Sequence, residues 1–135
     1  MKKRIFAIMF LLASVFVIND ICSTAPQMQL ITMDLPSMQR TYTSEKVAKA
    51  EFSEQKYWNN ATFNSNDNKK RYNLKVELRD TEGNTSRYQT VSNGGTWLFD
   101  KDWQQYAGRT YWINLKSGTW TLNKTYTTGI WYISY

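Results

Sequence analysis

The chain has 135 residues, the usual length of one domain, with 17 basic residues, 11 acidic residues and no histidine. Its only cysteine, Cys22, lies in a segment that we expect to be removed. The remaining chain therefore excludes a disulfide, a metal site built from cysteine or histidine, and catalysis by serine–histidine or cysteine–histidine systems. We expect no enzyme activity, no catalytic residue, no metal and no cofactor.

Residues 1–25 have the pattern of a secretory signal peptide. Basic residues at positions 2–4 precede an uncharged apolar run over residues 5–18, and small residues stand at Ser23 and Ala25. The run is shorter than the roughly 20 apolar residues that a transmembrane helix needs. We therefore predict a secreted protein, and the proline that follows Ala25 leaves the cleavage position open. Removal of this segment leaves 14 basic and 10 acidic residues, a mildly basic chain.

Residues 26–44 contain both prolines of the chain and three of its five methionines, without sustained periodicity. This composition is typical of a linker, an edge strand or a cleavable pro-segment. We place the folded domain at residues 45–135. Residues 47–52 alternate like a strand but are rich in helix-forming residues, and we prefer a strand because the segments downstream are all β. A further strand is predicted at residues 58–63 and a polar loop at residues 64–70.

The clearest alternation lies in residues 72–79, where Tyr72, Leu74, Val76 and Leu78 alternate with polar side chains. A period of two predicts a strand with one buried and one solvated face. All six glycines of the chain follow this strand, and most are spaced ten or more residues apart. Such spacing indicates turns between short antiparallel strands.

Further strands are predicted at residues 87–91, 96–99, 110–116, 119–127 and 130–135. In the third of these Tyr111, Ile113 and Leu115 share one face, so we expect Trp112 to point outward. In the fourth of these we expect Trp120, Leu122 and Tyr126 to point inward, so that Trp120 is enclosed. The last segment carries large apolar residues on both of its faces, so one face must point outward or be covered by another segment. About seven short strands in roughly 90 residues predict an all-β fold, a small antiparallel β-sandwich of immunoglobulin-like size, with a small β-barrel as the alternative.

The aromatic content is the main indication of function. All six tryptophans and all nine tyrosines lie after residue 25. An enclosed aromatic side chain buries about 150–250 Å², so a core of this size cannot hold them all, and exposed rings should mark a binding surface. The predicted loop at residues 100–108 carries rings beside amides and carboxylates. The predicted ligand-binding residues are Trp103, Tyr106 and Trp112 for stacking, and Asp102, Gln104 and Gln105 for hydrogen bonds.

Flat rings beside amides and carboxylates suit sugars, because a ring covers the apolar C–H face of a sugar while polar side chains bind its hydroxyls. We interpret the chain as a secreted, non-enzymatic binding module for cell-wall polysaccharide or a surface protein. The alternative is a bacteriocin-like or toxin-like effector whose positive charge and interfacial rings engage an anionic membrane. Nucleic acid is not an expected partner, because the basic residues are scattered apart from the run at 69–71 and the protein is predicted to be exported. No oligomeric state is predicted.

Overall fold

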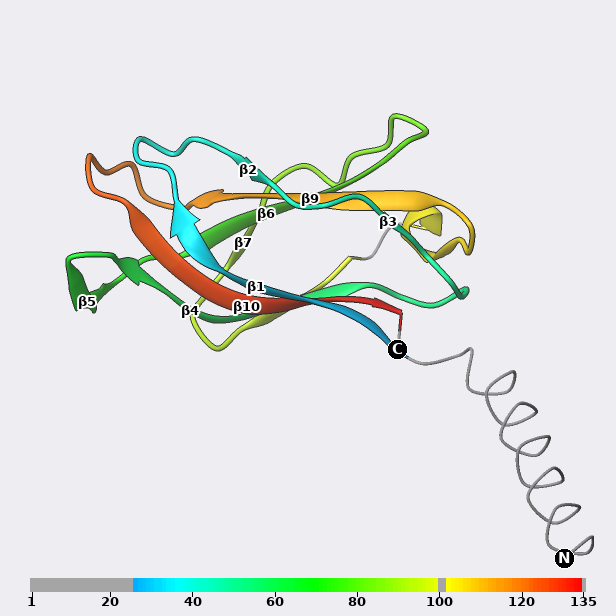
Figure 1. The fold of residues 1–135 in the computed structure, drawn as a ribbon, viewed down its shortest axis with the longest axis horizontal. Helices are drawn as coiled ribbons and strands as arrows, with labels where there is room; N and C mark the ends of the chain where they lie inside the picture. Colours follow the sequence, from blue (N-terminus) through cyan, green and yellow to red (C-terminus); the bar gives the residue numbers. More distant parts are fainter. Residues whose placement is uncertain (1–25, 100–101, 135) are drawn as a thin grey trace, which may run out of the picture.

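A computed structural model describes residues 26–99 and 102–134, and the predicted signal peptide at residues 1–25 lies outside these ranges. The described residues form two antiparallel β-sheets packed face to face, with a short 3₁₀ helix, η2 (Asp102–Gln105), and no α-helix (Figure 1). This arrangement confirms the predicted all-β class, and its two packed sheets correspond to the predicted small β-sandwich.

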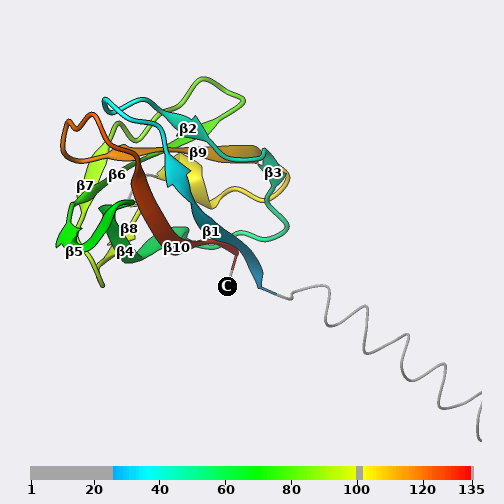
Figure 2. The same ribbon diagram turned by 60° about the vertical axis from the view of Figure 1, so that its left-hand side comes forward.

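Each sheet contains five strands, and the two layers are seen one above the other in Figure 2. The first sheet has the order β1 (Gln27–Leu35), β10 (Thr125–Ser134), β4 (Lys56–Asn64) and β5 (Asp67–Arg71), and β8 (Thr96–Leu98) pairs with the other half of β4. The second sheet has the order β2 (Tyr42–Thr43), β9 (Thr110–Ser117), β6 (Leu74–Asp80) and β7 (Gln89–Val91), and β3 (Val47–Ala48) also pairs with β9.

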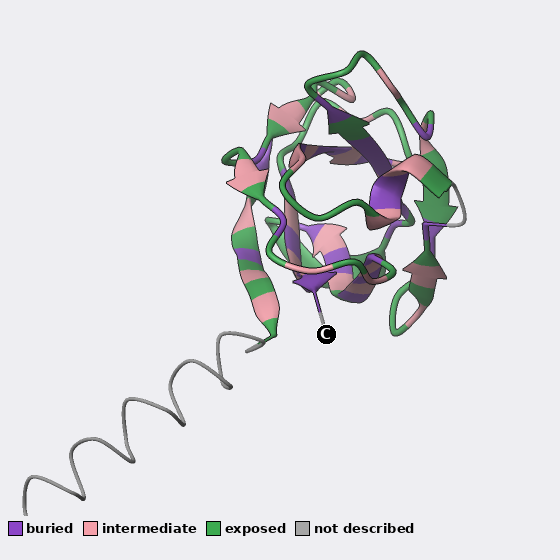
Figure 3. Ribbon diagram, turned by 90° about the vertical axis from the view of Figure 1, so that its right-hand side faces the viewer, coloured by how far each residue is buried: buried purple, intermediate pink, exposed green. Residues whose placement is uncertain are grey.

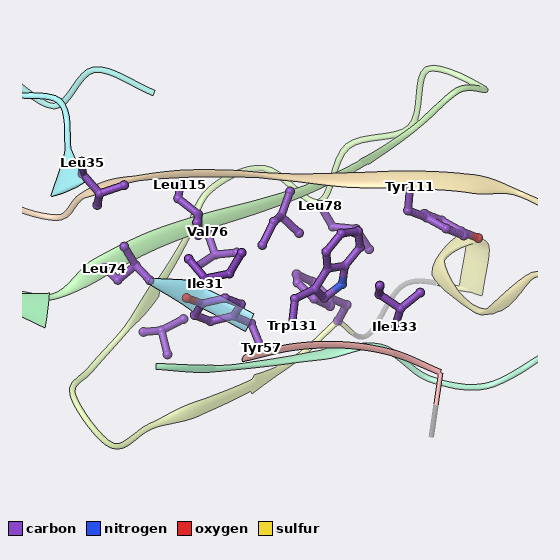
Figure 4. Packing of buried hydrophobic residues seen from close by; sticks show 13 residues of the cluster. Ile31, Leu35, Tyr57, Leu74, Val76, Leu78, Tyr111, Leu115, Trp131 and Ile133 are labelled. Atoms are coloured by element: carbon purple, nitrogen blue, oxygen red, sulfur yellow. The ribbon is translucent and has the colours of Figure 1, made fainter. Parts of the chain in front are cut away.

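The core lies between the sheets and is built from the alternating apolar positions of both. Val76 on β6 is opposite Leu115 on β9, and Leu78 is opposite Ile113, with all four side chains fully buried. Trp131 on β10 fills the space between the layers from the first sheet (Figure 4). Full burial of each such side chain contributes about 1.5–3 kcal/mol to stability. The alternation predicted for β6 and β9 is therefore confirmed.

The C-terminal strand corrects the prediction of separate strands at 119–127 and 130–135. β10 runs without interruption through Gly129, where an added Cβ would lie 2.3 Å from the Trp58 carbonyl oxygen of β4. The register between β10 and β4 shifts between Thr128 and Gly129, which marks a bulge at this point. Gly129 therefore allows two strands to approach closely, and it does not mark a turn.

The connection between β9 and β10 also differs from the prediction. Residues 118–124 cross from the second sheet to the first as a loop, and the Met38 backbone N–H donates to the Thr121 carbonyl oxygen at 2.7 Å. Because this segment belongs to neither sheet, its side chains face no opposite layer. Trp120 is 59% exposed and Leu122 is 72% exposed, so the prediction that these side chains point inward is wrong.

Two segments, residues 64–70 and residues 47–52, differ from the prediction in how much of each is a strand. Residues 64–70, predicted as a loop, include most of β5, because pairing with β4 supplies backbone partners that outweigh the low β-propensity of polar residues. The strand predicted at residues 47–52 is reduced to β3, two residues long. Its pairing ends there, and Lys49 instead bonds through its backbone N–H to the Arg109 carbonyl oxygen.

The N-terminal part of the described chain forms a strand. Of the three interpretations of residues 26–44, an edge strand is the one observed for residues 27–35. β1 pairs with β10 along its whole length and forms the edge of the first sheet. The folded part therefore begins before the predicted boundary at residue 45.

Candidate functional site

Trp103, the first predicted stacking residue, lies on η2 and is half-buried. Its ring stacks on that of Tyr111 of β9, with centroids 6.3 Å apart and planes inclined by 22°. The Tyr111 hydroxyl donates to the Trp103 carbonyl oxygen, and burial raises the pKa of this hydroxyl to about 12. These contacts place Trp103 against the rim of the core.

Gln104, predicted to bind ligand, is the buried residue of η2. Its side-chain Oε1 accepts a hydrogen bond from the Gln55 backbone N–H at 2.6 Å, and its carbonyl oxygen accepts one from Gln55 Nε2 at 2.7 Å. Gln55 Oε1 in turn accepts from the indole N–H of Trp131 at 3.0 Å. Gln104 therefore belongs to an interior network that joins η2 to β10.

The remaining predicted residues of this segment are more accessible. Tyr106 is 45% exposed, makes an edge contact with the Phe52 ring at 6.0 Å, and lies 4.8 Å beneath the guanidinium carbon of Arg109. Asp102 is exposed and Gln105 is half-buried on the same segment. These residues share one end of the sandwich, together with Phe52, which the sequence analysis had not selected.

Trp112 lies apart from the other predicted residues. It follows Tyr111 on β9, so its side chain points to the opposite face of the second sheet, as predicted. There it is half-buried and lies 4.8 Å from the ammonium group of Lys46. The six predicted residues therefore do not form one surface: three share an exposed segment, Trp103 and Gln104 pack inward, and Trp112 faces another side.

A larger apolar surface lies on the outer face of the first sheet, which we call the first-sheet face. Alternation along the strands sets its members, because residues that pair across antiparallel strands share one side of a sheet. It consists of Met28, Leu30, Thr32 and Asp34 on β1, Tyr126, Thr128, Ile130 and Tyr132 on β10, Lys56, Trp58, Ala61 and Phe63 on β4, Arg71 on β5, and Thr96 and Leu98 on β8.

The register arranges these residues in rows across the sheet. The rows are Met28–Tyr132–Lys56–Leu98, Leu30–Ile130–Trp58–Thr96, Thr32–Thr128–Ala61 and Asp34–Tyr126–Phe63–Arg71. Within the last row the rings of Tyr126 and Phe63 are 5.1 Å apart, and the guanidinium carbon of Arg71 lies 5.0 Å from the Phe63 ring. In the first row the Lys56 ammonium group lies 4.9 Å from the Tyr132 ring.

The first-sheet face is open to solvent. None of the described strands or loops packs over this side of the sheet (Figures 1 and 2), and Leu30 is 70% exposed. Exposed residues alternate with partly or fully buried ones along β1 (Figure 3). Tyr126, expected to point inward, belongs to this face because β10 begins at Thr125 with the buried positions at Thr125 and Thr127.

The outer face of the second sheet has the opposite character. Glu77 on β6 accepts hydrogen bonds from Arg79 Nε at 2.8 Å, Thr85 Oγ1 at 2.7 Å and Asn114 Nδ2 at 2.9 Å. Burial by itself would raise the pKa of the Glu77 carboxyl, but these hydrogen bonds and the Arg79 charge outweigh it and lower the pKa. The polar groups of this face are therefore largely satisfied by one another.

Lys49 is a buried charge that the sequence analysis did not select. Its ammonium group donates to the Ser53 hydroxyl at 2.9 Å and to the Ile133 carbonyl oxygen at the end of β10. Burial lowers the pKa of Lys49 to about 8, against the opposing effect of the Glu51 charge. The Ser53 backbone N–H is bonded to the Gln105 carbonyl oxygen, so the pair joins three segments at one end of the sandwich.

Within residues 26–99 and 102–134, no three acidic side chains gather as metal ligands. No helix in the same ranges has the length and apolar character needed to cross a bilayer. The chain matches no protein-family model and no curated protein sequence. Function is therefore inferred from the two surfaces described above.

The sequence contained a partial signal for the first-sheet face. Residues 130–135 carry large apolar side chains on both sides of the strand, which requires one side to face outward. Sequence alone did not show that β1 and β4 bring their own apolar residues to that same side, because strand order and register are long-range properties.

Proposed function

We propose that the protein is a secreted, non-enzymatic binding module and that its ligand, a polysaccharide, lies over the first-sheet face. One observation carries the proposal: this face exposes rows of apolar and aromatic side chains that no described element covers. The solvent side of an antiparallel sheet is ordinarily polar, as it is on the second sheet, and an extended exposed apolar surface indicates an interaction site.

The spacing of the rings suits a polymer of sugars. Tyr126 and Tyr132 stand six residues apart on β10, so they are separated by roughly 20 Å at the usual rise per residue. Trp58 and Phe63 lie beside them on β4. An extended ligand can therefore stack successive rings along two neighbouring strands, and each stacked ring contributes on the order of 1–3 kcal/mol, as for other ring ligands.

Polar groups for sugar hydroxyls lie between the rings. Thr32 and Thr128 place their hydroxyl oxygens 3.4 Å apart in the middle of the face, and the Asp34 carboxylate lies at its edge, where it accepts a bond from Ser65 Oγ at 2.9 Å. Hydroxyls and a carboxylate both accept hydrogen bonds from a sugar, and the threonines also donate. The face therefore combines the two kinds of contact that a sugar requires.

The second candidate is a bacteriocin-like or toxin-like action at a membrane surface. It is favoured by the exposed aliphatic side chains of Met28 and Leu30 on β1, because an aliphatic group adds apolar area and no hydrogen bond. Such groups favour the boundary between lipid headgroups and acyl chains. Leakage of liposomes treated with the protein would support this candidate, whereas the polysaccharide proposal expects none.

The proposal is tested with residues 26–135, which contain every described strand, in a retention assay on insoluble cell-wall polysaccharide. Trp58→Ala is expected to weaken retention about tenfold, the effect of one lost stacking contact. Trp112→Ala is the matched control, because Trp112 is also a half-buried tryptophan on an outer sheet face. Tyr106→Ala tests the segment selected from sequence. Loss of retention by Tyr106→Ala, with Trp58→Ala unaffected, would move the site to η2 and refute the proposal.

A further inference from the structure

The first-sheet face continues into a basic hairpin. β5 extends from β4 at the far edge of the first sheet and projects past the body of the sandwich (Figure 1), and all five of its residues are exposed. Three of them, Lys69, Lys70 and Arg71, are basic. None of these three forms an ion pair with an acidic group of the described residues. Their charges are therefore available to a ligand.

Part of this charge is in contact with the aromatic rings. Arg71 pairs with Phe63 in the register and lies over its ring, and Lys69 and Lys70 precede it in the irregular part of the same strand. Lys56 lies over the Tyr132 ring in the row at the opposite end of the face. A ligand that stacks on these rings would therefore meet a cation at both ends of its path.

The positive charge of the described residues is concentrated here. The first-sheet face, β5 and the adjoining Lys124 together carry five basic residues and two acidic residues. The two acids are already engaged, since Asp34 accepts from Ser65 Oγ and Asp67 accepts from the Lys69 backbone N–H at 3.1 Å. The other described residues carry eight basic and seven acidic groups, which nearly cancel.

We propose that the polymer bound by the first-sheet face is an acidic polysaccharide, whose carboxylate or phosphate groups meet Lys69, Lys70 and Arg71 while its sugar rings stack on the face. This inference rests on the proposed function and adds the class of ligand. An extended basic surface beside stacking rings attracts a polyanion and releases its counterions, which makes binding dependent on salt.

The polar groups of the face distinguish an acidic polymer from a bilayer. A face that enters a membrane keeps its cations at the rim, where they reach the headgroups, and Lys56 and Arg71 do lie in the two end rows. The middle row, however, holds the hydroxyls of Thr32 and Thr128, which insertion would remove from water at a cost. The Asp34 carboxylate on the same face would also meet anionic headgroups. A polymer lying on the surface encounters none of these penalties.

The test compares polygalacturonate with its methyl ester, which keeps the sugar ring and removes the charge. The variant is the triple substitution Lys69→Gln, Lys70→Gln and Arg71→Gln. The matched control, Arg40→Gln, Lys46→Gln and Lys75→Gln, removes the same charge outside the first-sheet face. Affinity is measured by titration at several salt concentrations, with anionic vesicles and a single-stranded oligo(dT) as further probes.

We expect the wild-type protein to prefer polygalacturonate to its methyl ester. The β5 variant should lose about tenfold or more in affinity for polygalacturonate and show a shallower salt dependence, by about one unit of slope per lost contact. The control should retain wild-type behaviour. Equal binding of both polymers, each weakened by Trp58→Ala, would overturn the inference and leave the proposed function intact. Tighter binding to vesicles or oligo(dT) than to polygalacturonate would overturn it also, and binding to no polysaccharide would refute the proposed function itself.

Discussion

Stability should rise between about pH 7.5 and 9.5 because of one buried lysine. The ammonium group of Lys49 is enclosed between Ser53 and the end of β10, and its pKa is about 8 in the folded protein. In the unfolded chain the pKa of lysine is about 10.4. Between these values the unfolded state binds more protons than the folded state, so the free energy of unfolding increases with pH. The Lys49 contribution over this interval is about 2 kcal/mol.

The increase in the free energy of unfolding ends at higher pH. Burial raises the pKa of the Tyr57 and Tyr111 hydroxyls, so the folded state keeps protons that the unfolded state loses near pH 10. A group with a raised folded pKa stabilises below its unfolded value and loses that contribution above it. Stability should therefore reach a maximum close to pH 10 and fall beyond it.

Urea unfolding followed by tryptophan fluorescence at several pH values measures this profile. Lys49→Met should abolish the rise, whatever its effect on stability at neutral pH, because the variant has no group that titrates at this position. Lys46→Met is the control, since Lys46 is exposed and the variant should keep the rise. If both variants retain the same slope, Lys49 is not the source of the pH dependence and the burial argument is wrong.

Three further predictions concern packing and processing. Trp131→Ala should cost about 3–5 kcal/mol in urea unfolding because the side chain is fully buried, whereas the exposed Trp120→Ala should change stability by about 0.5 kcal/mol or less. Gly129→Ala should destabilise the protein by about 1–3 kcal/mol or more, since its Cβ would lie 2.3 Å from the Trp58 carbonyl oxygen, and normal unfolding of this variant would contradict the close approach of the strands. The intact mass of the secreted protein should lack roughly the first 25 residues, and recovery of the full chain from membranes would contradict the signal peptide.

The sequence by itself determined the features that depend only on residues close together in the chain. Alternation along β6 and β9 reflects the period of a strand with one buried face, so it is readable without knowledge of the partners. The turn at Asn93-Gly94 is equally local, because Gly94 adopts a positive φ of 75° that suits glycine. The excess of aromatic residues over what a small core holds also followed from composition alone.

The sequence predicted only part of the candidate site correctly. Tyr106 and Asp102 are accessible as predicted, because a segment with many polar residues remains near the surface. Gln104 has the same local setting but is buried, because Gln55, 49 residues earlier in the chain, supplies its hydrogen-bond partners. A polar side chain can be enclosed when such partners exist, and the sequence around it does not reveal them.

Tertiary structure alone decided where the apolar rows lie. Leu30, Ile130 and Trp58 come from three distant segments, and only the order β1–β10–β4 and its register place them side by side. A shift of one residue in that register would turn each strand's outward residues to the core. The exposure of Trp120 has a similar origin, since its alternating segment crosses between the layers and belongs to neither. Pairing and layer crossing depend on contacts between distant residues, which local periodicity does not specify.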